Sequence, residues 1–539
     1  MKKHLEPRRY LVSFDTHTLS HIFTDVLVIG SGVAGLRAAL ETARHCSVLV
    51  ATKGHLSESN TERAQGGIAV VLAPGDRPEA HVKDTLDAGQ GLCDPLVVKE
   101  VIADGPKLIK ELIRWGASFD HEGGKLAFTR EGGHSSARIV HALGDATGRE
   151  VERALVTRTR SDAKITVMEH TFAVDLLTVD GGCRGCVVWQ DGKGFTLVRA
   201  KQTILATGGC GQVYRETTNP EIATGDGLAI AYRAGAELQD MEFMQFHPTT
   251  LYIAGATRAL ISEAVRGEGA YLLNKHGERF MPRYHPQAEL APRDVVSRSV
   301  LKEMRLSGGT CVYLDLRHLP KKRVIQRFPM IRDLCASFDL DITSDLIPVR
   351  PSAHYMIGGV KVDKHGLTSL GCLYACGEAA NSEFHGANRL GSNSLLEGLV
   401  FGQRAGQAAG RRAAHAKDNG PSLAITSKIS PTKQGELNLE DVENSLRSLM
   451  WRAVGVERSE SDLREAEEMI DFWCSYVLDK EFSTSAGWEL QNMLTVCKLM
   501  VSAARQRQES RGVHYRSDFP DRDDVKWRHH IALRNPSAK

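Results

Sequence analysis

The sequence has no marked excess of charge of either sign. Its 68 Lys and Arg residues nearly balance 66 Asp and Glu residues, which leaves a formal net charge of +2. This balance gives no indication of nucleic acid or a membrane surface as a partner. The chain also lacks an uncharged apolar run that approaches the ~18 residues of a membrane helix. We therefore expect a soluble chain with no membrane anchor and no nucleic-acid partner.

Regularly spaced cysteine pairs are also missing. The 11 cysteines are an odd number scattered over 539 residues, which is not a disulfide framework and suits a reducing compartment. The one close pair, Cys183 and Cys186, is flanked by glycines, so we interpret it as part of a turn between strands. The first twenty residues lack a sustained apolar segment and a small-residue cleavage site. These features predict a cytoplasmic protein without a secretory signal.

The length of the chain predicts more than one domain, because single cores stop growing at roughly 250–300 residues. Residues 25–30 form an apolar run that ends in glycines, and an apolar-periodic helix and a second strand follow. This order is typical of a Rossmann-type opening. Between residues 164 and 206, short β-rich runs predict an antiparallel insertion.

The C-terminal part of the sequence predicts a helical bundle. Residues 416–436 are polar, contain two prolines and are predicted to be a linker. Asn438 is a candidate N-cap for a first helix. Apolar residues at helical spacing mark three helices, namely Val442, Leu446, Leu449 and Met450; Leu463, Ala466, Ile470 and Trp473; and Leu490, Leu494, Cys497 and Val501.

The glycine pattern after the first strand predicts a dinucleotide site. Gly30, Gly32 and Gly35 would allow a tight turn, close approach of the backbone to a pyrophosphate and close packing of helix on strand. The helix N-terminus then offers amides to the phosphates. The second strand ends in Thr52 and Lys53 and lacks the acidic residue that usually binds an adenosine ribose, which argues against a typical NAD site.

Four later strings, QFHPTT, ELAPRD, SAHYMIGG and HGANRLGSNSLLEG, follow this opening. Together they resemble the flavoprotein superfamily of succinate dehydrogenase, fumarate reductase and L-aspartate oxidase, over about residues 25–520. The resemblance implies an α/β fold with a discontinuous FAD-binding domain, an inserted α+β capping domain and a C-terminal helical domain. The expected domain bounds are 1–24 for an N-terminal extension, 25–240 with 355–420 for FAD binding, 241–354 for the cap and 437–539 for the helices.

The resemblance implies FAD as the cofactor. Asp226 and Glu378 match positions that hold ribose or ribityl hydroxyls, for which a carboxylate is a suitable acceptor. Covalent members of the superfamily carry a histidine where this chain has Asn60, so we expect noncovalent FAD. The full expected cofactor set is Gly30, Ser31, Gly32, Ala34, Gly35, Thr52, Lys53, Asn60, Thr61, Gln65, Gly66, Gly67, Ala206, Thr207, Gly208, Asp226, Glu378, Asn393, Ser394 and Leu395.

The resemblance also implies a site for a four-carbon dicarboxylate. His354 and Arg389 match the pair that holds one carboxylate, for which the planar arginine fork is suited. His247 and Ser262 match the group that holds the other. Arg293 matches the arginine that moves a proton opposite the flavin, together with Glu263 and Arg266. Whether Arg293 accepts the proton lost by the substrate or only supplies one to fumarate stays open at this point.

Glu131 decides between the branches of the superfamily. It lies in LAFTREGGHSS, where the succinate and fumarate enzymes carry a neutral residue, and its carboxylate could pair with a substrate ammonium. We therefore expect oxidation of L-aspartate to iminosuccinate, with dioxygen or fumarate as electron acceptor and quinolinate synthase as consumer of the product on the route to NAD. The rival interpretations are the flavoprotein subunit of a succinate dehydrogenase or fumarate reductase, which Asn60 and Glu131 oppose, and a non-catalytic flavoprotein, which Arg293 opposes.

Overall fold

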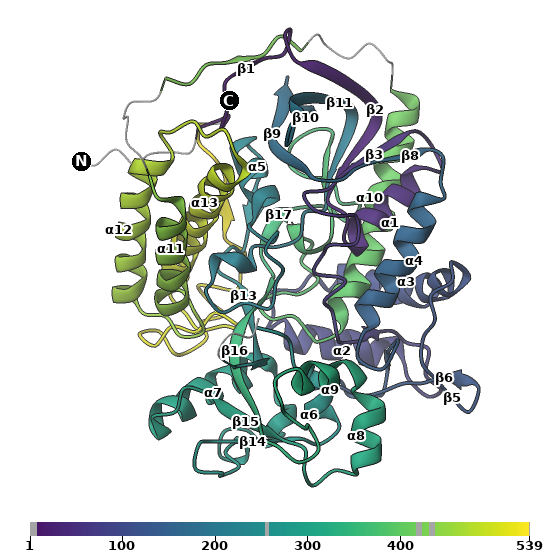
Figure 1. Cartoon of the computed structure of the whole chain (residues 1–539), viewed down its shortest axis with the longest axis vertical. Coiled ribbons are helices and arrows are strands. Elements are labelled where there is room, and N and C mark those ends of the chain that lie inside the picture. The colour runs from purple at the N-terminus through teal and green to yellow at the C-terminus, as the bar shows by residue number, and fades with distance from the viewer. Residues whose placement is uncertain (1–7, 254–257, 417–422, 431–436, 538–539) are drawn as a thin grey trace.

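The apolar strand before the first glycine loop lies in the middle of a largely parallel sheet. The computed structural model describes residues 8–253, 258–416, 423–430 and 437–537. In it, β2 (Ser20–Ile29) pairs in parallel with β3 (Val48–Ala51) on one side and with β11 (Gly194–Leu205) on the other. β18 (Leu373–Ala375) then pairs in parallel with β11. Distant parts of the chain therefore build one Rossmann-type sheet, and the predicted discontinuous domain is confirmed (Figure 1).

The predicted antiparallel insertion is smaller than expected. Only β9 (Thr171–Val179), β10 (Gly182–Gln190) and the first part of β11 pair in an antiparallel way. β8 (Ile165–Met168) instead extends the parallel sheet beside β3. The last two predicted runs are one continuous strand, β11, because both runs pair with β2 from Thr196 to Leu205. Local sequence patterns do not show which strands will pair with each other.

The interpretation of the cysteine pair as a turn was wrong. Cys183 and Cys186 both lie within β10 and are buried. The pairing with β9 shifts register between them, and Gly185 there has a φ of 123°. The glycine that suggested a turn therefore forms a bulge inside the strand.

A second sheet with its own core lies almost entirely within residues 241–354, and its last strand along the chain ends at Met356. The strands β13 (Met244–Leu251), β16 (Ile347–Met356), β15 (Val312–Asp315) and β14 (Tyr271–Leu273) follow one another in this sheet, all antiparallel. Four helices surround it, namely α6 (Glu263–Gly267), α7 (Arg293–Ser307), α8 (Lys321–Arg327) and α9 (Pro329–Ala336). Their apolar side chains form a separate cluster, as expected for an inserted α+β capping domain, which lies at the bottom of Figure 1.

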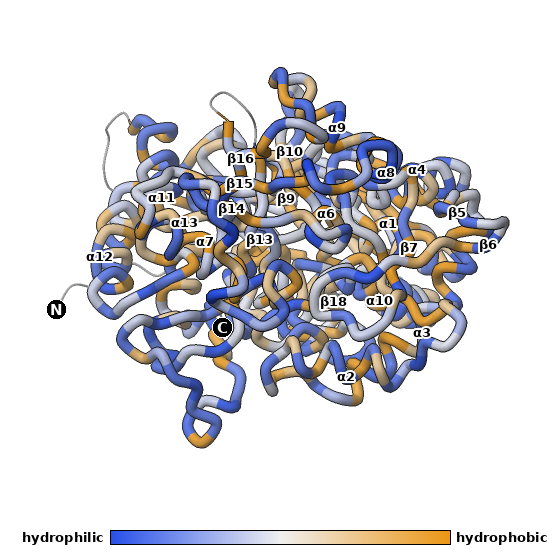
Figure 2. Tube along the Cα trace, turned by 90° about the horizontal axis from the view of Figure 1, so that it is seen from below, coloured by the Kyte–Doolittle hydropathy of each residue, from blue (hydrophilic) through white to orange (hydrophobic). Residues whose placement is uncertain are grey.

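Three helices stand side by side at the left of Figure 1, namely α11 (Leu439–Ala453), α12 (Glu460–Val477) and α13 (Ser485–Gln506). The Asn438 side chain accepts a hydrogen bond from the Asp441 amide, so the predicted N-cap is confirmed. The apolar residues of the three helices pack with α5 (Asp226–Arg233) and with side chains from one face of the Rossmann-type sheet. Figure 2 shows both hydrophilic and hydrophobic positions along these helices. Among the described residues, no helix is both long and apolar enough to cross a bilayer.

The N-terminal extension packs on the antiparallel strands. Leu11, Val12 and Phe14 share an apolar cluster with Trp488 and with side chains of β9 and β10. β1 (Phe14–Asp15) pairs with β20 (Thr426–Ser427) in the segment that was predicted to be a linker. Residues 1–7 of the extension and residues 417–422 and 431–436 of that linker lie outside the described residues.

Helix α10 (Asn393–His415) packs on α1 (Val33–Thr42) through glycines at every fourth position, Gly398, Gly402, Gly406 and Gly410. A Cβ atom at Gly402 would lie 2.5 Å from the Ala34 carbonyl oxygen, and one at Gly406 would lie 2.4 Å from that of Ala38. The two backbones are therefore in direct contact.

The remaining elements surround these layers: α2 (Pro78–Ala88), α3 (Pro95–Arg114), α4 (Thr147–Arg160), β4 (Ile68–Ala69), β5 (His121–Glu122), β6 (Lys125–Leu126), β7 (Ile139–Val140), β12 (Leu238–Gln239), β17 (Gly359–Lys361), β19 (Ala380–Asn381) and β21 (Ala532–Leu533). β21 adds an edge strand to β12. The C-terminal tail therefore returns to the part of the chain that leads into the cap.

Candidate cofactor and substrate site

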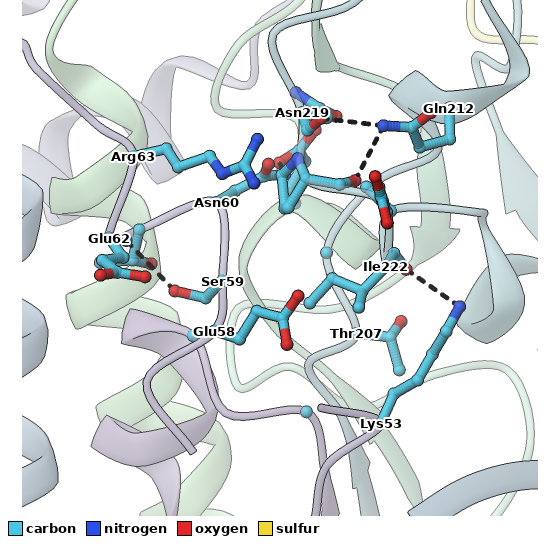
Figure 3. A pocket seen from close by; sticks show the side chains of 18 of the residues that line it. Lys53, Glu58, Ser59, Asn60, Glu62, Arg63, Thr207, Gln212, Asn219 and Ile222 are labelled. Atoms are coloured by element: carbon cyan, nitrogen blue, oxygen red, sulfur yellow. Dashed lines mark hydrogen bonds between the residues drawn. The ribbon is translucent and has the colours of Figure 1, made fainter. Parts of the chain in front are cut away.

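A cavity of about 1170 Å³ runs from the N-terminus of α1 to the N-terminus of α10. Figure 3 shows Lys53, Asn60 and Thr207 around it. Most of the expected cofactor residues line this cavity, namely Gly30, Ser31, Gly32, Ala34, Thr52, Lys53, Asn60, Thr61, Gln65, Ala206, Thr207, Gly208, Asp226, Glu378, Ser394 and Leu395. The structure therefore brings together residues that span more than 360 positions of the sequence.

The glycine loop at one end of the cavity has the geometry that the sequence pattern suggests. Gly30 has a φ of 108°, and a Cβ atom there would lie 2.2 Å from the Ala206 carbonyl oxygen. A Cβ atom at Gly35 would lie 2.1 Å from the Gly30 carbonyl oxygen, so Gly35 shapes the turn without lining the cavity. The first turn of α1 contains no acidic residue. This helix N-terminus therefore suits a phosphate group.

Three other expected cofactor residues also lie outside the cavity lining, namely Gly66, Gly67 and Asn393. The Asn393 side chain instead forms hydrogen bonds with His81 (2.8 Å) and Thr85 (3.1 Å) of α2. A Cβ atom at Gly67 would lie 2.3 Å from the Val140 carbonyl oxygen. These residues position the backbone around the site.

Lys53 fills the position where a typical NAD site carries an acid. Its Nζ atom lies 2.9 Å from Asp226 Oδ2 and 2.6 Å from Glu489 Oε1, and it donates to Thr224 Oγ1 at 2.8 Å. Asp226 also accepts a hydrogen bond from Asn492 at 2.7 Å. The acidic group that can accept a ligand hydroxyl is therefore supplied by α5, and Lys53 fixes its position.

Asn60 and Glu378 form a pair in the wall of the cavity. Asn60 Nδ2 donates to Glu378 Oε2 at 3.0 Å, and the Met356 amide donates to Glu378 Oε1 at 3.0 Å. Burial raises the pKa of Glu378 to about 7, although these hydrogen bonds oppose the shift. The buried Thr207 Oγ1 and Asn219 Oδ1 atoms have no hydrogen-bond partner within the described residues. A ligand with several polar groups, such as FAD, would satisfy them.

His354 connects the cavity to a second group of buried residues. It lines the cavity, and its ring centroid lies 5.2 Å from that of His247. Thr218 Oγ1 lies 2.9 Å from His354 Nδ1, and the buried His247 Nε2 has no partner among the described residues. Burial, with Arg389 and Arg293 nearby, holds the pKa of His354 well below its ordinary value. Burial, Arg293 and His354 do the same for His247. Both rings are therefore neutral hydrogen-bonding groups.

Arg293 and Arg389 meet at Gln245. Arg293 Nη1 and Arg389 Nε each donate to Gln245 Oε1 at 3.2 Å. Arg293 Nε also donates to Glu263 Oε2 at 2.6 Å. Burial and the neighbouring Arg293 lower the pKa of Arg389 to about 10, so the guanidinium stays charged at neutral pH. The shared acceptor places two cations side by side.

Two further residues complete this cluster at α6. Arg266 Nη2 lies 3.3 Å from Glu263 Oε1. Burial alone would raise the pKa of Glu263, but Arg293 and Arg266 hold it below its ordinary value. Ser262 is the N-cap of α6, and its amide donates to Gln65 Oε1 of the cavity wall at 3.1 Å. The expected dicarboxylate residues therefore lie in one cluster next to the cavity.

Glu131 is buried at the edge of the same cluster. Its Oε2 accepts a hydrogen bond from Ser392 Oγ at 2.7 Å, whereas Oε1 is buried without a hydrogen-bond partner within the described part of the chain. A Cβ atom at Gly391 would lie 3.0 Å from Glu263 Oε2, 3.1 Å from Arg293 Nη2 and 3.5 Å from Glu131 Oε2, so the three charged groups gather around this glycine. Burial and the charge of Glu263 raise the pKa of Glu131. A cation bound beside Glu131 would lower this pKa again.

The charges of the cluster suit a dianion. Arg293, Arg389 and Arg266 face Glu263, whose lowered pKa keeps it ionised, and Glu131, whose pKa is raised. The excess positive charge can be neutralised by two carboxylates, and arginine binds a carboxylate through two parallel N–H donors. A charged group that lost its partner in this buried place would be costly.

Sequence reasoning missed Gln245 and Ser392. Gln245 precedes His247 by two residues in strand β13, and residues two apart point to the same side of a strand. This alternation could have identified Gln245. Ser392 adopts a left-handed conformation with a φ of 62° just before α10, and no local pattern in the sequence indicates its contact with Glu131.

The fold and the cavity define a flavin-binding protein. Residues 25–395 match the FAD binding domain family, and residues 443–539 match the fumarate reductase flavoprotein C-terminal family. E. coli quinol fumarate reductase FrdA superposes with a TM-score of 0.89 at 32% identity, covering 96% of this chain and 95% of that one.

Curated relatives narrow the class. An L-aspartate oxidase of Streptomyces coelicolor is 44% identical, over 96% of this chain and 92% of the relative. The chloroplastic L-aspartate oxidase 2-b of Nicotiana tabacum is 45% identical, over 92% of this chain and 81% of the relative. The chain belongs to the L-aspartate oxidase family of FAD-binding flavoproteins.

Proposed function

We propose that this protein oxidises L-aspartate to iminosuccinate, with FAD as the oxidant. The observation that carries the proposal is the buried Glu131, whose Oε1 has no hydrogen-bond partner within the described residues and lies 3.8 Å from His141 Nε2, beside an arginine cluster that suits two carboxylates. A four-carbon dicarboxylate with an ammonium group satisfies both. Bound FAD supplies the acceptor for the hydride that leaves the substrate α-carbon.

The side chains have separate tasks in this proposal. His354 and Arg389 hold one carboxylate, His247 and Ser262 hold the other, and Glu131 orients the ammonium group. Arg293 lies between the substrate residues and Glu263, with Arg266 behind it. A proton at Arg293 therefore has a path through Glu263 toward Arg266. The neutral state of both histidines fits a binding role and does not fit a role as a charged acid.

The electrons and the product must be passed on. We propose dioxygen, giving hydrogen peroxide, and fumarate, giving succinate, as the electron acceptors, and quinolinate synthase as the consumer of iminosuccinate in the synthesis of NAD.

The location and the domain division are also proposals. All 11 cysteines are free thiols, which supports a cytoplasmic location. The pairing of β13 with β16 brings the two ends of the segment 241–354 together, which supports the proposed division into FAD-binding and capping domains.

The test is an anaerobic mixture of the yellow holoprotein with L-aspartate. We expect the flavin absorbance to bleach, and to return when fumarate is added. Bleaching by succinate under the same anaerobic conditions, but not by L-aspartate, would instead identify the rival succinate dehydrogenase or fumarate reductase type of flavoprotein.

We also propose that FAD is held without a covalent bond. Asn60 lies in the cavity wall and its amide is engaged by Glu378, and an amide cannot replace the imidazole that covalent members of the superfamily use. Acid precipitation should therefore release the flavin into the supernatant. Flavin that stays on peptides after protease digestion of the pellet would contradict this.

A further inference from the structure

Two loops bring together three metal-binding side chains that do not line the cavity. His55 follows β3, and Glu169 and His170 form the turn between β8 and β9. One ligand atom of each residue lies within 4.8 Å of the other two. Within the described residues, no other group of three or more His, Cys, Asp or Glu side chains meets this spacing. None of the three belongs to the substrate cluster.

The backbone holds the two loops against each other. The amides of Thr52, Thr171 and His170 donate to the carbonyl oxygens of Met168, Thr52 and Gly54 at 3.0, 2.8 and 3.2 Å. The two imidazole rings lie edge to face with centroids 4.4 Å apart. The ligands are therefore presented by a fixed frame, and only exposed side chains need to move.

The carboxylate of Glu169 is aimed by the same frame. Its Oε1 accepts a hydrogen bond from the Leu56 amide at 2.7 Å, and Arg160 Nη2 lies 3.4 Å from that oxygen. Its Oε2 lies 3.9 Å from His55 Nδ1, which is too far for a hydrogen bond. Ligand atoms bound to one zinc ion at about 2.0–2.1 Å lie roughly 3.3 Å apart in a tetrahedron. Small rotations of the exposed rings therefore suffice to close the site.

We propose that His55, Glu169 and His170 bind a divalent transition-metal ion of the Zn²⁺ type. Imidazole nitrogens select zinc, copper and nickel, whereas magnesium and calcium prefer oxygen ligands. Three protein ligands leave one tetrahedral position for water. Arg160 contacts Oε1 of Glu169, so Oε2 of Glu169 stays available to the ion.

The position of the site gives it a structural consequence. His55 lies in the loop whose neighbouring residues Lys53, Glu58, Ser59 and Asn60 line the cofactor cavity, and Glu58 and Ser59 are labelled in Figure 3. An ion would fasten this loop to the β8–β9 turn. Because an ion that binds only the folded state raises stability, Zn²⁺ should raise the melting temperature of the holoprotein.

The test measures Zn²⁺ binding to the chelator-treated holoprotein by titration calorimetry. We expect one ion per chain, and no binding of Mg²⁺ under the same conditions. Loss of a residue that only hydrogen-bonds to a metal ligand weakens metal binding by about 10–100-fold. Loss of a ligand itself, in His55→Ala or His170→Ala, should therefore weaken Zn²⁺ binding by at least about tenfold. His365→Ala, which removes an exposed histidine from another turn, is the matched control and should bind like the wild type.

Two further readouts separate a built site from loose surface binding. Bound Cu²⁺ should give an electron paramagnetic resonance spectrum with two nitrogen ligands, reduced to one in either variant. The Zn²⁺-dependent rise in melting temperature should disappear in both variants. Equal Zn²⁺ affinity in the wild type, both histidine variants and the control would overturn the proposal, as would binding of Mg²⁺ with the same affinity.

Discussion

Glu131→Gln is the sharpest perturbation of the proposed function. Glutamine has almost the same shape, and its amide oxygen can still accept the hydrogen bond that Ser392 donates at 2.7 Å. The change therefore removes the charge and leaves the packing. Removing one partner of a buried ion pair costs about 3–5 kcal/mol, and each 1.4 kcal/mol is about tenfold. We expect kcat/KM for L-aspartate to fall by about 10²- to 10⁴-fold.

Fumarate provides the internal control, because it has no ammonium group. Fumarate reduction with an artificial electron donor should survive in the same variant. The loss of a negative charge beside the arginines also favours tighter binding of fumarate. Glu303→Gln changes a buried carboxylate whose partners are Arg283, Tyr284 and Asn274, so it controls for an unspecific effect of the substitution.

The pH dependence gives a second measurement. Burial and Glu263 raise the pKa of Glu131, so the side chain is protonated over a wider range of pH than an exposed glutamate. Protonation removes the partner of the ammonium group. The affinity for L-aspartate should therefore weaken as pH falls through this raised pKa, and the affinity for succinate should not. Equal losses of aspartate and fumarate activity in Glu131→Gln would refute the assignment.

Three other changes test neighbouring parts of the site. Arg293→Leu should abolish both aspartate oxidation and fumarate reduction while FAD stays bound, and loss of the flavin absorbance would reassign Arg293 to structure. Arg389→Leu should weaken succinate binding by an amount on the order of 3–5 kcal/mol, and an unchanged dissociation constant would remove Arg389 from the site. The pKa of Glu378 is raised to about 7, so its protonation stabilises the fold of the apoprotein below that pH. This contribution is lost as pH rises through about 7, and the melting temperature of Glu378→Gln apoprotein should fall less than that of the wild type between about pH 5 and about pH 8.

The helices could be predicted well because their burial follows the sequence period. Leu446, Leu449 and Met450 are buried on one side of α11, and an apolar stripe at helical spacing has few other interpretations. Strand partners were less predictable. β11 carries Lys201, which ends the apolar run locally, but this lysine pairs with Asp25 of β2 at 2.8 Å and the strand continues. That contact joins residues 176 positions apart.

The candidate site shows the same limit. His247 and Arg389 were recognisable because each lies in a distinctive string, whereas Gln245 matters only because it accepts from two arginines that the fold brings together. The packing of Leu11 against Trp488 was also beyond local patterns. Asn393 matches a string expected at the flavin, but its side chain is bound by His81 and Thr85. Motifs locate a residue in the chain and do not say which way its side chain points.

The glycine contact between α1 and α10 links the two ends of the cofactor cavity. α1 begins at the glycine loop, and the first turn of α10 contributes Ser394 and Leu395 to the lining at the other end. Because Gly402 and Gly406 bring the two backbones together, the spacing between these ends is set by main-chain atoms. The residues of the capping domain lie on one side of this fixed spacing and do not set it. If Glu131 has the role proposed above, a substitution there changes the substrate preference without disturbing the alignment of the cofactor.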